Sequence, residues 1–143
     1  MLTRYPDWPE RLRAFLDGAA RRPFSWAEFN CCLFAAAGVA ALTGTDPAAP
    51  LRGKFTTRRQ AYAALKRFAS GGVPEIAGKI AAALGCPEIP PRLAQRGDVV
   101  LVDGTAGPAL GLCAGAAVAV LKPEGGIGYV PIVDPSLRKA WKI

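Results

Sequence analysis

The residues best suited to chemistry in this chain are two adjacent cysteines, Cys31 and Cys32, which follow Asn30 at the expected start of an apolar helix. Backbone N–H groups at a helix N-terminus favour the thiolate, which is the nucleophilic form of cysteine. Thiol hydrolases also need a proton-transferring base, commonly histidine, and the sequence contains no histidine. Cys31 is therefore the candidate nucleophile and Asn30 the candidate helix cap, in a site without its usual base. The alternative interpretation makes both cysteines small buried residues of an alanine-rich helix.

Helices are expected to position the two cysteines. Helical spacing of apolar residues, bounded by capping residues and glycines, predicts four helices in the first 85 residues. The second, Cys31 to Leu42, is apolar on nearly every side and should be central and buried. The third should direct Ala61, Leu65 and Phe68 inward. The predicted ranges are 8–18 (with Asp7 as the cap, and an end between Gly18 and Arg22), 31–42, 58–70 (capped by Thr57) and 74–84.

The second half of the chain changes from helical to strand patterning. After Arg96-Gly97-Asp98, short apolar runs alternate with glycine-rich turns, which predicts an antiparallel meander. The expected strands are 99–102, 109–113, 116–121 and 128–133, with Gly125-Gly126 in the last hairpin turn. Asp134-Pro135-Ser136 is expected to cap a final helical turn that carries Trp141. Helices followed by strands predict an α+β fold with the N-terminal helices packed on a C-terminal antiparallel sheet.

Size and composition fit a single domain over residues 1–143. The chain has 143 residues, of which 51% are hydrophobic, enough for one core. No apolar run is long enough to span a bilayer, and charge and proline occupy the N-terminus where a secretion signal would need an apolar stretch. The net charge of +7 comes from scattered Lys and Arg without interleaved aromatics, so it favours a basic protein-binding surface over nucleic-acid binding.

The order of these motifs resembles the NlpC/P60 superfamily of papain-like cell-wall peptidases, and more closely its small phage and prophage members encoded beside tail genes. The resemblance is carried by Trp26, the polar cap, Cys31 and the apolar helix, then by Arg96 to Leu101 opening the sheet. The segments 42–47, 52–55 and 140–143 also resemble that phage group. The usual pattern reads Asp-Cys, so Asn30 stands at the aspartate position. The resemblance implies a reduced NlpC/P60 fold.

In catalytically competent relatives a histidine begins the strand after the Gly-Asp-Val segment, and Ala109 stands at that position here. The resemblance therefore implies a degenerate peptidase scaffold that serves as a structural component of a phage or phage-like tail tip or baseplate. Its expected partners are other tail proteins and peptidoglycan. The expected location is the host cytoplasm during assembly and then the particle tail. No cofactor is expected.

Other functions remain open at this stage. An active cysteine peptidase or amidase could cleave peptidoglycan crosslinks through Cys31 with an unconventional base, such as Asp98 or Asp103, or with one supplied by a partner chain. A metal site is disfavoured because adjacent cysteines on one helix point about 100° apart. The remaining cysteines, Cys86 and Cys113, show no metal-ligand spacing.

Overall fold

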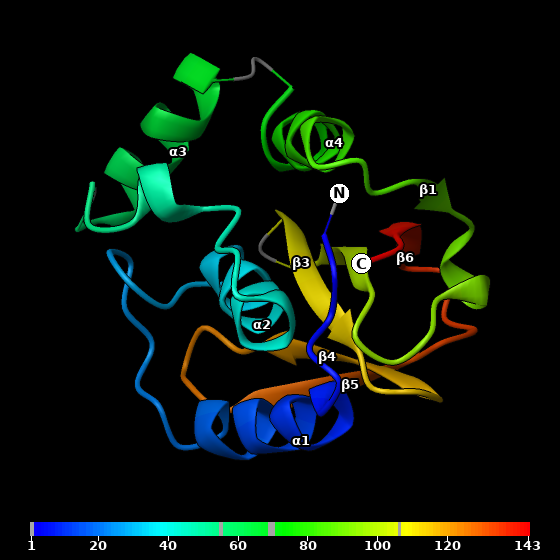
Figure 1. Cartoon of the computed structure of the whole chain (residues 1–143). Coiled ribbons are helices and arrows are strands. Elements are labelled where there is room, and N and C mark those ends of the chain that lie inside the picture. The colour runs from blue at the N-terminus through cyan, green and yellow to red at the C-terminus, as the bar shows by residue number, and fades with distance from the viewer. Residues whose placement is uncertain (1, 55, 69–70, 106) are drawn as a thin grey trace.

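The computed structural model describes residues 2–54, 56–68, 71–105 and 107–143, without the side chains of Leu65 and Phe68. The described residues form an α+β fold in which helices pack on one face of a six-stranded antiparallel sheet (Figure 1). The helices are α1 (Trp8–Ala19), α2 (Leu33–Thr43), α3 (Arg58–Phe68) and α4 (Val73–Ala83), with short 3-10 turns η1 (Ala49–Leu51) and η2 (Pro91–Leu93). The inward orientation predicted for Leu65 and Phe68 lies outside the described side chains.

The predicted meander is confirmed, with strands β2 (Val99–Gly104), β3 (Gly107–Cys113), β4 (Ala117–Leu121) and β5 (Ile127–Pro131). Its last hairpin turns at Gly125 and Gly126, whose φ angles of 95° and 81° are strained for residues other than glycine. The sheet order β1-β6-β2-β3-β4-β5 adds two strands that the sequence patterns did not predict, β1 (Glu88–Ile89) and β6 (Leu137–Trp141).

The final helical turn predicted after Asp134 is wrong. Asp134 does accept a hydrogen bond from the Ser136 N–H at 2.8 Å, but this bond forms a turn that leads into β6. β6 then pairs with both β1 and β2, and Trp141 is buried at 4% exposure. Pairing with strands distant in sequence therefore outweighs the local capping pattern.

Helix α2 lies at the centre of the molecule and contacts β3 (Figure 1). The approach is close enough that a methyl group added at Gly38 would overlap the side chain of Leu112. Phe34 and Leu42 on α2 are fully buried, as expected for a helix with little polar surface. The helix ends at Gly44, whose φ of 80° completes a left-handed C-cap.

One predicted helix start and one predicted cap need correction, although α1 begins at Trp8 as predicted. Helix α2 begins at Leu33, so Cys31 and Cys32 lie in the turn that precedes it. Asp7 does not cap α1 with its side chain, because its carboxylate pairs with Arg11 at 2.7 Å. Thr57 does cap α3, since its hydroxyl oxygen accepts a hydrogen bond from the Gln60 N–H at 3.1 Å.

Candidate functional site

The side-chain amide of Asn30 stabilises the start of α2 by both accepting and donating hydrogen bonds. Its Oδ1 accepts from the N–H groups of Cys32 and Leu33, each at 2.9 Å, and its Nδ2 donates to the Trp26 carbonyl at 2.9 Å. The Asn30 carbonyl accepts from Phe34 N–H at 2.9 Å. These are the bonds of a helix N-cap, although regular helical geometry begins only at Leu33. Asn30 is 3% exposed, so every polar group of its side chain is used internally.

Arg52 fastens the turn that leads into this cap. Its Nη1 donates to the Glu28 carbonyl at 2.7 Å, its Nη2 to the Leu33 carbonyl at 3.2 Å, and its Nε pairs with Asp46 at 2.6 Å. Gly53 N–H also donates to the Ala27 carbonyl at 2.9 Å. Arg52 therefore ties the cysteine turn to the segment before α3. The sequence singled out this position only through the expected resemblance of residues 52–55 to the phage group; Phe55 of that segment lies outside the described residues.

The pKa of the Cys31 thiol is lowered to about 7. The main cause is a hydrogen bond with the Cys32 thiol, supported by the backbone N–H of Cys31 and by the positive charge of Arg58, while burial acts in the opposite direction. The same contact, together with burial, raises the pKa of the Cys32 thiol. The thiol pair therefore releases its first proton from Cys31, which is the residue predicted to be the nucleophile.

The two thiols face a small, mostly apolar pocket of about 30 Å³. Helix α3 supplies one wall through Ala61 and Tyr62, and the Arg58 guanidinium lies 5.4 Å from the centre of the Tyr62 ring. The described lining contains no carboxylate that could accept the thiol proton: Trp26, Asn30, Cys31, Cys32, Leu33, Leu51, Ala61, Tyr62 and Val73. Sequence reasoning missed Arg58 and Tyr62 because they lie almost 30 residues away, on a helix with no recognisable motif.

Strand β3 passes beside Cys31, where the Leu110 N–H donates to the Cys31 carbonyl at 3.3 Å. Alternation along the strand puts Leu110 and Leu112 on the face that packs against α2. Ala109 pairs with Val102, which belongs to the apolar cluster on the opposite face of the sheet. The β3 residue nearest the thiols on the α2 face is therefore Leu110, and the side chain of Ala109 projects from the other face.

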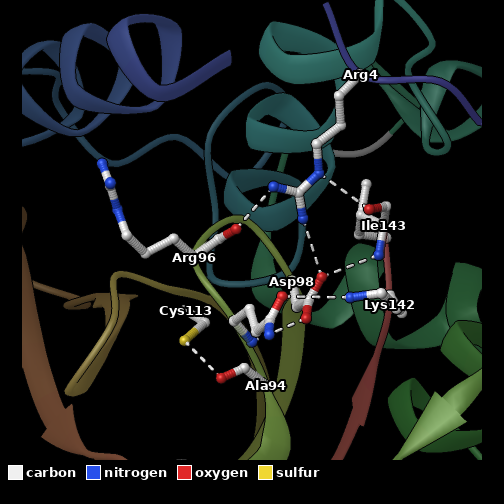
Figure 2. Close-up of polar contacts among 8 residues, drawn as sticks. Arg4, Ala94, Arg96, Asp98, Cys113, Lys142 and Ile143 are labelled. Atoms are coloured by element: carbon white, nitrogen blue, oxygen red, sulfur yellow. Dashed lines mark hydrogen bonds and ion pairs between the residues drawn. The ribbon is translucent and has the colours of Figure 1, made fainter.

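Asp98, one of the two carboxylates considered as a replacement base, is fully occupied elsewhere (Figure 2). Its Oδ1 accepts from Arg4 Nη2 and from Ile143 N–H, each at 3.0 Å, and its Oδ2 accepts from Gln95 N–H at 2.9 Å. It is completely buried. Asp103 is exposed and pairs with Arg138 at 3.4 Å. Asp98 thus joins the two ends of the chain, and neither carboxylate lines the thiol pocket.

An apolar cavity of about 90 Å³ lies behind Cys32, between α2, α4 and the sheet. It shares Cys32, Leu33, Leu51 and Val73 with the thiol pocket. Both cysteines line the thiol pocket. The expected divergence of about 100° assumed that both residues are helical, and this premise is wrong, because both precede α2. Within the residues that the structure describes, no three side chains of His, Cys, Asp or Glu lie close enough to hold a metal ion.

Residues 3–143 match the family described as Domain of unknown function (DUF6950). The chain belongs to this family. No curated protein matches the DUF6950 chain. The match covers the cysteine turn, the helices and the sheet, so the site described above is contained within the family's domain. None of the helices in the described part of the DUF6950 chain is long and apolar enough to cross a bilayer.

Proposed function

We propose that this DUF6950 chain is a structural component of a phage or phage-like tail tip or baseplate, built on a papain-like peptidase scaffold of the reduced NlpC/P60 type. The observation that carries the proposal is the thiol pocket, in which a capped Cys31 is retained while the described lining offers neither carboxylate nor imidazole. General acid–base groups contribute typically about 10²–10⁴-fold to such reactions, so this site is poorly equipped for turnover.

In this proposal the chain folds in the host cytoplasm, binds neighbouring tail proteins and remains in the particle tail, where peptidoglycan is within reach. The α+β domain and the absence of a membrane-spanning helix among the described residues are compatible with such a role. The surfaces available for neighbours include the exposed apolar side chains of Leu93, Tyr129 and Val133.

The proposal is tested in the strain that produces the particle. Deletion of the gene should prevent tails from forming normally, and wild-type protein and Cys31→Ala should both restore them, because the scaffold and not the thiol is required. Mass spectrometry of purified tails should detect the chain. Normal tails from the deletion strain, or the absence of the chain from purified particles, would contradict a structural role.

A second function is favoured by the pKa of Cys31, which at about 7 supplies thiolate under physiological conditions. An active cysteine peptidase or amidase would use this thiolate to attack a peptide carbonyl, forming a thioester while the leaving amine takes up a proton. A partner chain would have to supply the proton donor. Restoration of tails by wild type but not by Cys31→Ala would favour this function over the structural one.

A further inference from the structure

Lys and Arg are scattered along this chain, but most of its net positive charge comes from one stretch that lacks acidic residues. Residues 47–74 contain six Lys or Arg and no Asp or Glu, in a chain that has 18 basic and 11 acidic residues. Of the six, Arg52 is held by Asp46, and the other five are exposed. Those five residues are Lys54, Arg58, Arg59, Lys66 and Arg67.

Basic residues outside this stretch are paired more often. Among the described residues, five ion pairs lie elsewhere on the molecule, and none joins any of these five side chains to an acid. A local excess of unpaired charge destabilises a domain through self-repulsion, so an acidic partner would be attracted to this region. The five pairs are Arg4–Asp98, Arg11–Asp7, Lys79–Glu75, Arg138–Asp103 and Lys139–Glu88.

The charge borders a hollow of about 850 Å³ between η1 and α3. Lys54 enters it from the loop, and Arg59 and Arg67 enter it from α3, where they lie about two turns apart. Pro50, Ala63 and Ala64 also line the hollow and add apolar surface to it. In Figure 1, α3 stands at the edge of the molecule, away from the sheet. A hollow lined by both cations and small apolar residues suits an extended peptide with acidic side chains.

We propose that this hollow is a docking site for an acidic peptide segment of a partner protein. Such a segment would place carboxylates against Lys54, Arg59 and Arg67 and small side chains against Ala63 and Ala64. Single-stranded nucleic acid suits the surface less well, because it stacks its bases on aromatic rings, and none of the described side chains that line the hollow is aromatic. The inference deepens the proposed function by naming the surface that a neighbouring protein would contact.

The test measures fluorescence anisotropy of a labelled octaglutamate peptide with the full chain, at salt concentrations from about 20 mM to about 300 mM. Wild-type protein should bind the peptide at low salt and lose affinity as salt rises. Arg59→Glu/Arg67→Glu should weaken binding about tenfold or more. Arg13→Glu/Arg21→Glu, which changes net charge equally on exposed positions away from the hollow, should weaken it less than about threefold. A cooperative urea unfolding transition close to that of wild type would show that each variant is folded.

Two results would overturn the inference. One is equal weakening by the two double variants, which would mean that net charge alone attracts the peptide. The other is a labelled octathymidine oligonucleotide that binds more tightly than octaglutamate and depends on Arg59 and Arg67, which would make the hollow a nucleic-acid site. Because no tail protein enters the assay, loss of this docking site and failure of the tail-component proposal are distinguishable.

Discussion

The Arg4–Asp98 pair is expected to be the polar contact whose loss costs this fold the most. Asp98 is completely buried, and Arg4 has a side-chain exposure of 17%. Removal of one partner from a buried ion pair costs about 3–5 kcal/mol, because the other charge is left without compensation. Arg4→Ala should fall at the low end, about 3 kcal/mol, since two backbone N–H groups still bond to the carboxylate.

Asp98→Ala should cost a similar amount by a different route. It leaves the N–H groups of Gln95 and Ile143 without their acceptor, at about 1–3 kcal/mol for each buried unsatisfied group. The Arg4 guanidinium retains its bonds to the carbonyls of Arg96 and Ile143, at 2.8 and 2.9 Å. The double variant should therefore cost about 4 kcal/mol and not the roughly 6 kcal/mol of two independent losses, which gives a coupling energy of about 2 kcal/mol.

Urea unfolding of the four proteins at one pH measures this coupling. Each single variant should shift the unfolding midpoint by roughly 1–3 M if the urea dependence is about 1–3 kcal/mol per M. The exposed Arg138–Asp103 pair, at 45% and 53% side-chain exposure, is the matched control and should couple by less than about 1 kcal/mol. Equal coupling energies in the two pairs would refute the expectation that burial makes the Arg4–Asp98 pair the more strongly coupled one.

Further variants address the cysteine turn. The alkylation rate of Cys31 should rise with pH around a midpoint near 7. Cys32→Ala should move that midpoint to higher pH, because it removes the main cause of the lowered Cys31 pKa. An unchanged midpoint would mean that another group lowers the pKa. Asn30→Ala should cost about 2 kcal/mol of stability in urea unfolding because the cap is lost. Asn30→Asp should also destabilise the fold, because a carboxylate cannot donate a hydrogen bond to the Trp26 carbonyl; wild-type stability would contradict this bond. Leu110→His should shift the pH midpoint of Cys31 alkylation and Ala109→His should not, because of these two positions only 110 is on the face of β3 that packs against α2. The opposite result would mean that Ala109 is on that face.

Local patterns in the sequence were sufficient for much of the fold. Helical spacing and glycine stops located α1 to α4 within a few residues, and the glycine-separated apolar runs located β2 to β5. The pattern Leu137-Arg-Lys-Ala-Trp141 was harder to interpret, because its exposure follows neither strict alternation nor a helical period. A bulge where it pairs with Leu101 and Val102 explains this irregularity, and such a bulge depends on residues far away in the sequence.

The candidate site was predictable only in part. Asn30 and Cys31 stood out because capping and thiolate stabilisation depend on adjacent residues. The roles of Arg52 and Arg58 depend on how the chain returns to the cysteine turn, which no local pattern encodes. Ala109 illustrates a similar limit. The resemblance assigned the histidine position to Ala109 from the order of motifs. A shift of one residue along a strand moves a side chain to the other face of the sheet, and a motif does not fix the position to a single residue.

Hydrolysis of peptidoglycan fragments by the purified chain, beside Cys31→Ala and with or without the neighbouring tail proteins, tests the central claim most directly. A scaffold that retains its thiol but lacks a base should release no product above the Cys31→Ala background under either condition. Turnover by wild-type protein that disappears in Cys31→Ala would contradict the claim and identify the chain as a working hydrolase.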